Sequence, residues 1–246
     1  MDSVTTEQRK TLAAVRKFCA ETEWATVLQG LELLVSLNDP VLWGAMASGL
    51  TLDRWGKIEI AADSEVARRA KAANRLRMAL YCIAYGNNTG PITLLNLSYQ
   101  DTLQDLTVLP RFGNIKSLNM DACDGISDLT PLAKLSNLEI LSINGCNSIS
   151  NLSPIANLLN LKKLSIRNSP NIQDLKPLRN LVNLEALDMS QCERITDLEP
   201  LSNLKELKTL NIAYTKASDL RPLSKLPQLE ALQISGTYRA ADIWVC

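Results

Sequence analysis

The chain has 246 residues, with 26 Lys plus Arg and 26 Asp plus Glu, so its formal net charge is zero. This balance argues against a protein held to nucleic acid or to an anionic membrane mainly by bulk charge. The sequence has no His, which excludes His-based zinc sites, Ser-His-Asp and Cys-His catalysis and the usual near-neutral general base. Aromatic residues make up only 4%.

The first 90 residues predict a small helical domain. Thr5 and Gln8 have the spacing of a capping box ahead of an amphipathic helix of about 15 residues. A second helix is expected over 24–37, and a third over 39–49, where Asp caps and Pro takes the first helical position. Three Trp residues of this part are expected in its core: Trp24, Trp43 and Trp55.

Residues 50–60 predict a turn with a short hairpin, and 64–85 predict a last helix that ends at Gly86. The last helix carries five basic residues: Arg68, Arg69, Lys71, Arg75 and Arg77. Nucleic-acid binding through this helix is therefore one alternative function. However, residues 1–90 contain 11 basic and 10 acidic residues, and no aromatic residue lies among the arginines. A solvated helix face is the favoured interpretation, and nucleic acid is not the expected partner.

Apolar residues recur in a fixed frame from Ile92 to the end of the chain. One copy of the frame is Leu138, Leu141, Ile143, Cys146, Ile149, Leu152, Ile155 and Leu158. Shifts of 23 residues reproduce it twice in each direction. The sixth copy, which begins at Leu207, is one residue shorter, and Leu229 begins a truncated seventh. We therefore expect a repeat domain over 91–246, with about six full repeats and a seventh that is incomplete.

Each copy combines a strand pattern with a turn pattern. Leu-x-x-Leu-x-Ile has the period of two that is typical of a short strand with one buried face. The Leu-x-Pro-Leu that follows suits a helical turn, because Pro gives up an N–H that would be unpaired at its first position. One copy cannot bury its own row of Leu. Stacked copies bury it by forming a parallel sheet over a continuous core.

These residues resemble the leucine-rich-repeat family, and in particular the internalin-like and trypanosomal-type repeats. The shared pattern is Leu-x-x-Leu-x-Leu-x-x-Cys/Asn-x-x-Ile-x-Asp-Leu-x-Pro-Leu, and it covers residues 91–246. The resemblance implies an α/β solenoid, shaped as a horseshoe with parallel strands on its concave face, after a small all-α domain at 1–90. It does not name a ligand, because the family uses one scaffold for many partners.

One position of the repeat holds small or polar residues that are expected to turn inward. Its occupants are Gln100, Cys123, Cys146, Ser169, Cys192, Thr215 and Thr237. A metal site, or a disulfide between neighbouring coils, is one interpretation of the cysteines. The same position accepts Ser, Thr and Gln, which favours a side chain that hydrogen-bonds the turn backbone. We expect reduced thiols, no metal and no cofactor.

A second position, just before the Leu-x-Pro-Leu turn, holds acidic residues or Asn. They are Asp105, Asp128, Asn151, Asp174, Asp197, Asp219 and Asp242. A stack of carboxylates could hold calcium. Asp and Asn also cap turns by accepting backbone N–H groups, and this interpretation accounts for Asn equally well.

A third position alternates in charge from coil to coil. Its residues are Lys116, Glu139, Lys162, Glu185, Lys208 and Glu230. Neighbours in a parallel stack lie side by side, so the alternation favours one register. An exposed pair contributes only about 0–1 kcal/mol. We interpret this row as structural and do not expect an anion-binding surface there.

These features favour a protein-interaction scaffold without enzymatic activity, whose concave face binds another protein. The side chains expected on that face are Tyr99, Asp121, Asn144, Arg167, Asn168, Ser190, Gln191 and Tyr214. The alternative is the substrate-recognition part of an enzyme or of a secreted bacterial effector that resembles ubiquitin ligases. Those ligases carry a catalytic Cys in a helical domain after the repeats. Here Cys19 and Cys82 precede the repeats, and nothing in the local sequence activates them.

The two chain ends lead to two further expectations. No apolar run near the N-terminus resembles a secretion signal, and no Leu-rich stretch is free enough of charge to span a membrane. We therefore expect a cytoplasmic protein, while secretion as an effector without a cleaved signal stays open. The last coil reaches Trp244 without the Pro-Leu-x-x-Leu stretch of the other copies. An apolar edge costs about 25 cal/mol per Å² when exposed, so self-association or further sequence is expected to cover it.

Overall fold

The computed structural model describes residues 5–19, 50–52, 58–60, 92–101 and 103–237, together with positions 27, 29, 31, 37, 42, 45 and 46. The chain divides into two compact units, Met1–Ile92 and Thr93–Cys246. Several predictions fall outside the described residues. These are the basic helix at 64–85, the core positions of Trp24, Trp43 and Trp55, and the chain end from 238 onward with Asp242 and Trp244.

The first unit begins with helix α1 (Thr6–Cys19). The N–H of Thr5 donates to Oε1 of Gln8 at 2.8 Å, and the N–H of Gln8 donates to Oγ1 of Thr5 at 3.2 Å. This reciprocal pair is the predicted capping box, and it pairs two N–H groups that the helix itself leaves unpaired. On the same helix Leu12 and Val15 are buried, as expected for an amphipathic segment.

The remaining described residues of the first unit are helical positions and a two-stranded ribbon. Val27, Leu31, Leu42 and Met46 are helical and buried. They form two pairs with a spacing of four residues, which places each pair on one helix face. Strands β1 (Leu50–Leu52) and β2 (Ile58–Ile60) pair antiparallel, which confirms the short hairpin. The ribbon lies between the stretches of this unit that were predicted to be helical.

The second unit is a stack of coils with one strand in each coil. The strands are β3 (Leu94–Asn96), β4 (Ser117–Asn119), β5 (Ile140–Ser142), β6 (Lys163–Ser165), β7 (Ala186–Asp188), β8 (Thr209–Asn211) and β9 (Ala231–Gln233). They pair in parallel in sequence order. From β3 to β8 each register shift is 23 residues, and Thr209 of β8 faces Ala231 of β9, a shift of 22. The period and the shorter sixth repeat are therefore confirmed.

A short 3-10 helix lies in the same coil as each of β3 to β8. These helices are η2 (Leu109–Arg111), η3 (Thr130–Lys134), η4 (Ser153–Ile155), η5 (Lys176–Asn180), η6 (Glu199–Asn203) and η7 (Arg221–Lys225). Each has Pro at its first or second position, as predicted. The Asp/Asn row is also confirmed as caps. Asp128, for example, accepts the N–H of Thr130 at 2.8 Å, and Asn151 accepts that of Ser153 at 2.9 Å.

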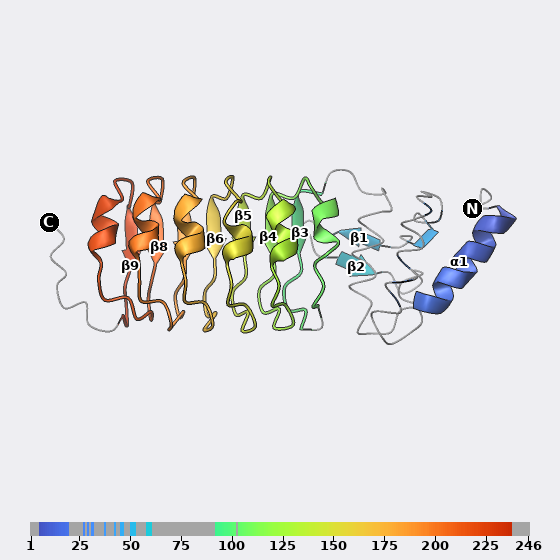
Figure 1. Cartoon of the computed structure of the whole chain (residues 1–246), viewed down its shortest axis with the longest axis horizontal. Coiled ribbons are helices and arrows are strands. Elements are labelled where there is room, and N and C mark those ends of the chain that lie inside the picture. Colours follow the sequence, from blue (N-terminus) through green and yellow to red (C-terminus); the bar gives the residue numbers. More distant parts are fainter. Residues whose placement is uncertain are drawn as a thin grey trace. The chain divides into compact units, whose positions relative to one another are not determined.

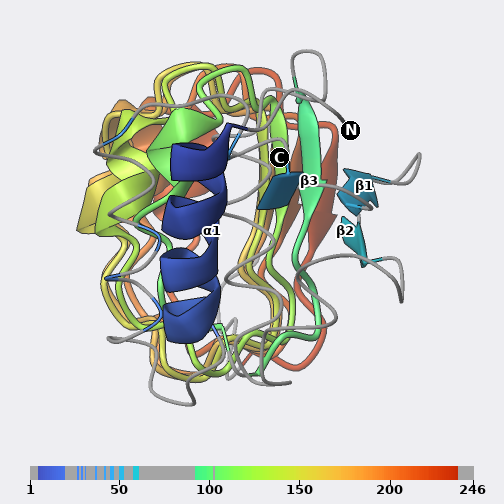
Figure 2. The same cartoon turned by 90° about the vertical axis from the view of Figure 1, so that its right-hand side faces the viewer.

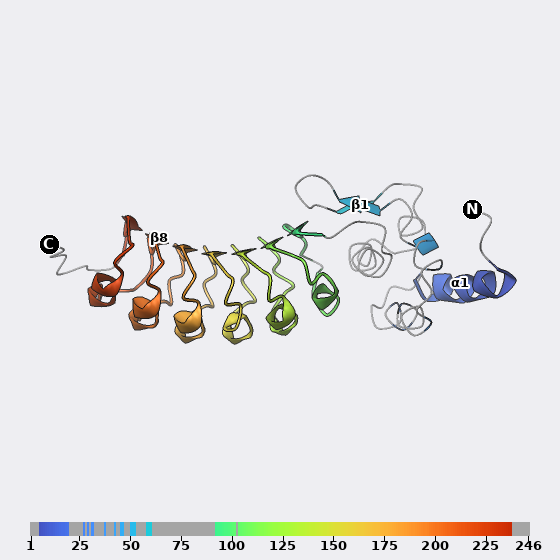
Figure 3. The ribbon, with the colours of Figure 1, turned by 90° about the horizontal axis from the view of Figure 1, so that it is seen from above.

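The strands and the 3-10 helices lie on opposite sides of the stack (Figure 1). Seen along the stack, the coils superpose, with the sheet on one side (Figure 2). Figure 3 shows that the strands follow a shallow arc, whose hollow side is the outer surface of the sheet. Helical turns are wider than the strand spacing of about 4.8 Å, so the stack bends toward the sheet. This unit is therefore an α/β solenoid with strands on its concave side.

The core of the solenoid is the set of inward side chains from successive coils. The middle residue of each of β3 to β8 is buried, and both of its neighbours face outward. Leu118, Leu141 and Leu164 are typical of this row, with 0–2% of their surface exposed. Burial of each such Leu contributes about 1.5–3 kcal/mol. The core thus fixes which strand residues are left for a partner.

Candidate partner-binding surface

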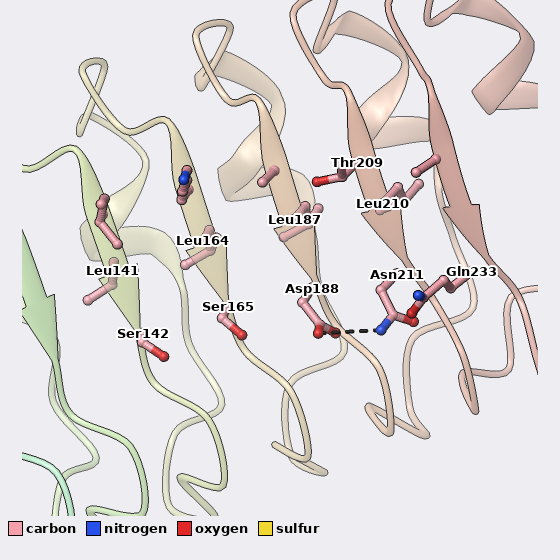
Figure 4. Close-up of a pocket in the computed structure, with 14 residues that line it drawn as sticks. Leu141, Ser142, Leu164, Ser165, Leu187, Asp188, Thr209, Leu210, Asn211 and Gln233 are labelled. Atoms are coloured by element: carbon pink, nitrogen blue, oxygen red, sulfur yellow. Dashed lines mark hydrogen bonds between the residues drawn. The ribbon is translucent and has the colours of Figure 1, made fainter.

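The outward residues of β3 to β9 form one continuous surface, which we call the strand face. They are Leu94, Asn96, Ser117, Asn119, Ile140, Ser142, Lys163, Ser165, Ala186, Asp188, Thr209, Asn211, Ala231 and Gln233. Most of them are small and polar, and none is aromatic. Part of this surface, from β5 to β9, lines an open hollow of about 480 Å³ (Figure 4). Short side chains such as Ser165 and Ala186 leave this space open.

The eight residues predicted to bind a partner lie beside the strands and not on them. Four lie two residues beyond a strand end: Asp121, Asn144, Arg167 and Ser190. Four lie three residues beyond a strand end: Tyr99, Asn168, Gln191 and Tyr214. None of them lines the hollow. They form the edge of the curved surface, and the strand residues at its centre were not among those predicted.

Side chains at the strand ends accept a backbone N–H two residues further on. The pairs are Asn96 with Ser98 at 3.0 Å, Asn119 with Asp121 at 2.8 Å, Asp188 with Ser190 at 2.9 Å and Asn211 with Ala213 at 3.0 Å. Asn and Asp make this local turn readily because the side-chain oxygen reaches the backbone. The turn leaves the sheet at the same point in each of these coils.

In β5 and β6 the last strand residue is Ser, and a residue of the preceding coil accepts the corresponding backbone N–H instead. Oδ1 of Asp121 accepts the N–H of Asn144 at 2.8 Å and the Ser142 hydroxyl at 2.6 Å. Oδ1 of Asn144 accepts the N–H of Arg167 at 2.8 Å and the Ser165 hydroxyl. The Asn144 amide also donates to Oγ of Ser142 at 2.9 Å. Two predicted partner-binding residues therefore join neighbouring coils.

The residue three positions beyond each strand adopts a left-handed backbone conformation. The φ values are 60° at Tyr99, 53° at Ala122, 65° at Gly145, 53° at Asn168, 62° at Gln191, 58° at Tyr214 and 68° at Gly236. The backbone N–H of this residue donates to the next coil, as Tyr99 does to the Asp121 carbonyl at 2.7 Å. Gly and Asn suit this conformation, but for Tyr it costs about 1–2 kcal/mol.

Two tyrosines of this left-handed row are the most exposed aromatic side chains among the described residues. Tyr99 is 78% exposed and Tyr214 is 56% exposed. The Tyr214 ring lies against the next coil, since a Cβ on Gly236 would stand 2.5 Å from Cδ1 and Cε1 of that ring. For Tyr99, little burial offsets the backbone strain. Strained and exposed residues of this kind concentrate at functional sites.

The inward row that contains the cysteines is structural, as predicted. The Cys123 thiol donates to the Leu97 carbonyl at 3.0 Å, and the thiols of Cys146 and Cys192 make the same bond one and three coils further on. The Ser169 hydroxyl also bonds the preceding coil, to the Ile143 carbonyl at 3.2 Å. Burial raises the pKa of the Cys123 and Cys192 thiols to about 11 and raises that of Cys146. All three cysteines are free.

The row of alternating charge forms ion pairs between coils. Glu139 lies 2.9 Å from the Lys116 ammonium and 2.8 Å from that of Lys162, and Lys208 lies 2.9 Å from Glu185. Hydrogen bonds from Lys162 and Lys116 lower the pKa of Glu139 to about 2. The bond from Lys208 likewise lowers the pKa of Glu185. The predicted pairing is therefore present at these three contacts.

One row of asparagines that joins neighbouring coils was not identified from the sequence. The side-chain amides of Asn137, Asn160 and Asn183 donate to the carbonyls of Gly113, Ser136 and Leu159 in the preceding coil, at 2.8, 2.9 and 2.8 Å. Their common place directly before the first Leu of the repeat was a signal that could have revealed it. These bonds join the coils on the turn that leads into each strand, and they bring no chemistry to the strand face.

Comparison with known proteins identifies the repeat. Residues 159–203 match the family model described as leucine-rich repeats in two copies. The matched segment includes β6, η5, β7 and η6, and the same coil geometry extends from β3 to β9. Residues 93–237 form a leucine-rich-repeat solenoid. A comparison with curated proteins found no match to this sequence.

Solved leucine-rich-repeat structures share this fold. The internalin inlF of Listeria monocytogenes has a TM-score of 0.61 and 21% identity, over 91% of this chain and 71% of that one. The internalin C2 of the same species has a TM-score of 0.56 and 28% identity, over 80% of this chain and 93% of that one. TLR13, from a crystal structure of a TLR13–ssRNA13 complex, has a TM-score of 0.54 and 18% identity over 69% of this chain. That match spans only 24% of the TLR13 chain.

The described part of the chain offers neither a membrane-spanning helix nor a metal-binding cluster. No helix in that part of the chain combines the length and the apolar character needed to cross a membrane. Nor do the same residues contain a group of three or more His, Cys, Asp or Glu that could hold a metal ion. The carboxylates of the Asp/Asn row instead accept backbone N–H groups in their own turns, as Asp174 does from Lys176 at 2.9 Å.

Proposed function

We propose that this protein is a binding scaffold, and that a protein partner docks on the strand face of the repeats. The observation that carries the proposal is the curved sheet with a hollow of about 480 Å³ among small outward side chains. Solenoids of this kind use such concave surfaces for binding. The buried thiols and capping carboxylates have structural partners within the repeat. The proposal therefore gives the chain a binding role and no catalytic one.

The edge of the strand face supplies the anchors. Arg167 and Tyr214 are exposed, and Arg and Tyr are among the residues that contribute most to protein interfaces. Tyr99 is even more exposed than Tyr214. The hollow is lined by small polar side chains together with apolar ones such as Ile140 and Ala186, so it suits a projecting loop or helix of the partner. We propose that these anchors hold that element at its sides while the hollow receives its tip.

Affinity capture from cell lysate, followed by binding measurements with the purified partner, tests this proposal. Arg167→Ala or Tyr214→Ala should weaken binding by more than about 1 kcal/mol, since a few anchors dominate interface energies. The matched controls are Lys176→Ala and Glu199→Ala, at the first residues of η5 and η6 on the opposite side. If the controls weaken binding and the anchor variants do not, the binding surface has been assigned to the wrong side.

A further inference from the structure

Two cations in the middle coil of the solenoid form no ion pair with an acidic residue in the part of the chain that the structure describes. Lys163 is exposed on β6, and no ion pair or hydrogen bond of its ammonium is found among the described residues. Arg167 is exposed four residues further on, and its guanidinium makes one bond, from Nε to Oε1 of Gln191 at 3.3 Å. Both side chains lie on the outward side of the same coil, on either side of Ser165.

The acidic residues around these cations already have donors. Asp121 accepts the Ser142 hydroxyl and the Asn144 N–H. Asp188 accepts the N–H and the hydroxyl of Ser190 at 2.9 and 2.7 Å. Glu185 pairs with Lys208 at 2.9 Å. These carboxylates therefore already accept other donors, whereas Lys163 and Arg167 form no ion pair among the described residues, although the formal charges of the strand face and its edge balance.

We propose that the partner presents an acidic segment whose carboxylate binds Lys163 and Arg167, with an apolar side chain beside it in the hollow. This inference rests on the proposed function. Charge complementarity at the two unpaired cations supports the carboxylate. Ile140, which is 39% exposed and faces Lys163 in the neighbouring strand, and Ala186 on the other side supply apolar contact for the second side chain.

A nucleic acid fits these residues less well than an acidic peptide. Phosphate chains require an excess of positive charge along the surface. Here Lys163 and Arg167 are balanced by Asp121 and Asp188, and the charge row beside the strands alternates in sign. Single-stranded nucleic acids also need aromatic platforms for successive bases; the strand face has none, and the exposed Tyr99 and Tyr214 on its edge lie five coils apart. One localised acidic group on a protein needs neither feature.

The probe is a random peptide library displayed on phage and selected on the full chain. Selected peptides should be enriched in Asp or Glu next to an apolar residue. Lys163→Gln or Arg167→Gln should weaken the binding of a selected peptide about tenfold, as expected for loss of a charge-assisted bond. The control Lys134→Gln, at the end of η3, should have no effect. The double variant Lys163→Glu/Arg167→Glu should select basic peptides instead, and circular dichroism confirms that each variant is folded.

Ala186→Trp, which fills the hollow beside Lys163, separates the two proposals. If selected peptides fail to bind this variant but show no acidic excess, the acidic segment is wrong and the strand face stands. If the variant binds them as well as the native chain does, the strand face itself is wrong. A library that shows no enrichment overturns the acidic segment as a sufficient ligand. Poly(U) RNA that binds more tightly than the peptides, and loses binding in Lys163→Gln, overturns it in favour of nucleic acid.

Discussion

Replacement of Tyr99 by Gly should make the protein more stable and its partner binding weaker. Tyr99 has a φ of 60° and is 78% exposed, so its ring contributes little burial to offset the strained backbone. Gly adopts the left-handed conformation without the strain that a residue other than Gly or Asn carries there, and removal of that strain stabilises the fold by about 1–2 kcal/mol. The greater freedom of Gly in the unfolded chain offsets about 0.5–1 kcal/mol of this gain. The expected net effect is a stabilisation of about 0–1.5 kcal/mol.

Urea denaturation followed by circular dichroism measures this change. The slope of the unfolding free energy against urea concentration should be the same in both proteins, which checks that only stability has changed. Asn168→Gly is the matched control at the same repeat position, and it should lose about 0.5–1 kcal/mol of stability, because Asn tolerates a positive φ and only the greater freedom of Gly in the unfolded chain changes. Tyr214→Gly should gain less than Tyr99→Gly, since the Tyr214 ring contacts the Gly236 backbone. A Tyr99→Gly variant less stable than the native protein by more than about 0.5 kcal/mol would refute the strain argument.

The other predictions concern interactions inside the solenoid. Brief alkylation of the native protein, mapped by mass spectrometry, should leave the three buried thiols (Cys123, Cys146 and Cys192) unmodified, because burial raises their pKa; rapid labelling of any of them would contradict their structural role. Asn144→Ala should destabilise the fold by about 2 kcal/mol in urea titrations, because it removes two hydrogen bonds between coils and one within its own coil; an unchanged midpoint would show that these bonds are dispensable. The lowered pKa of Glu139 gives stability that is present above about pH 4.5 and lost as the pH falls toward about 2. Thermal melts over this range should show a smaller acid-side loss in Glu139→Gln, and equal losses in both proteins would contradict the pairing.

The fold was predictable because the same pattern of residues recurs in every coil. Each coil repeats the same inward Leu residues, and their 23-residue shift is the register of the sheet. The Asp and Pro positions likewise indicated the capped 3-10 turns. Local rules of this kind depend on neighbours in sequence, so they can be inferred from one chain.

The candidate binding surface was only partly predictable, because it depends on where the strands end. The frame placed the candidate residues two or three positions beyond each strand end, on the turn that follows the strand. Gly145, Asn168 and Gly236 share one repeat position, and this was an available signal of a left-handed turn. The bridging role of Asn144 could not be inferred in this way. It arises because Ser165 in the next coil leaves an N–H to be paired, which only the packing of two coils reveals.

The most direct test of the binding role places a photo-crosslinking amino acid at one of two positions in the full chain. Thr209 is an exposed residue of the strand face, and Lys176 lies in η5 on the opposite side. We expect irradiation with the captured partner to give a crosslinked product from position 209 and none from position 176. A product from position 176 alone would contradict the central claim that the strand face is the binding surface.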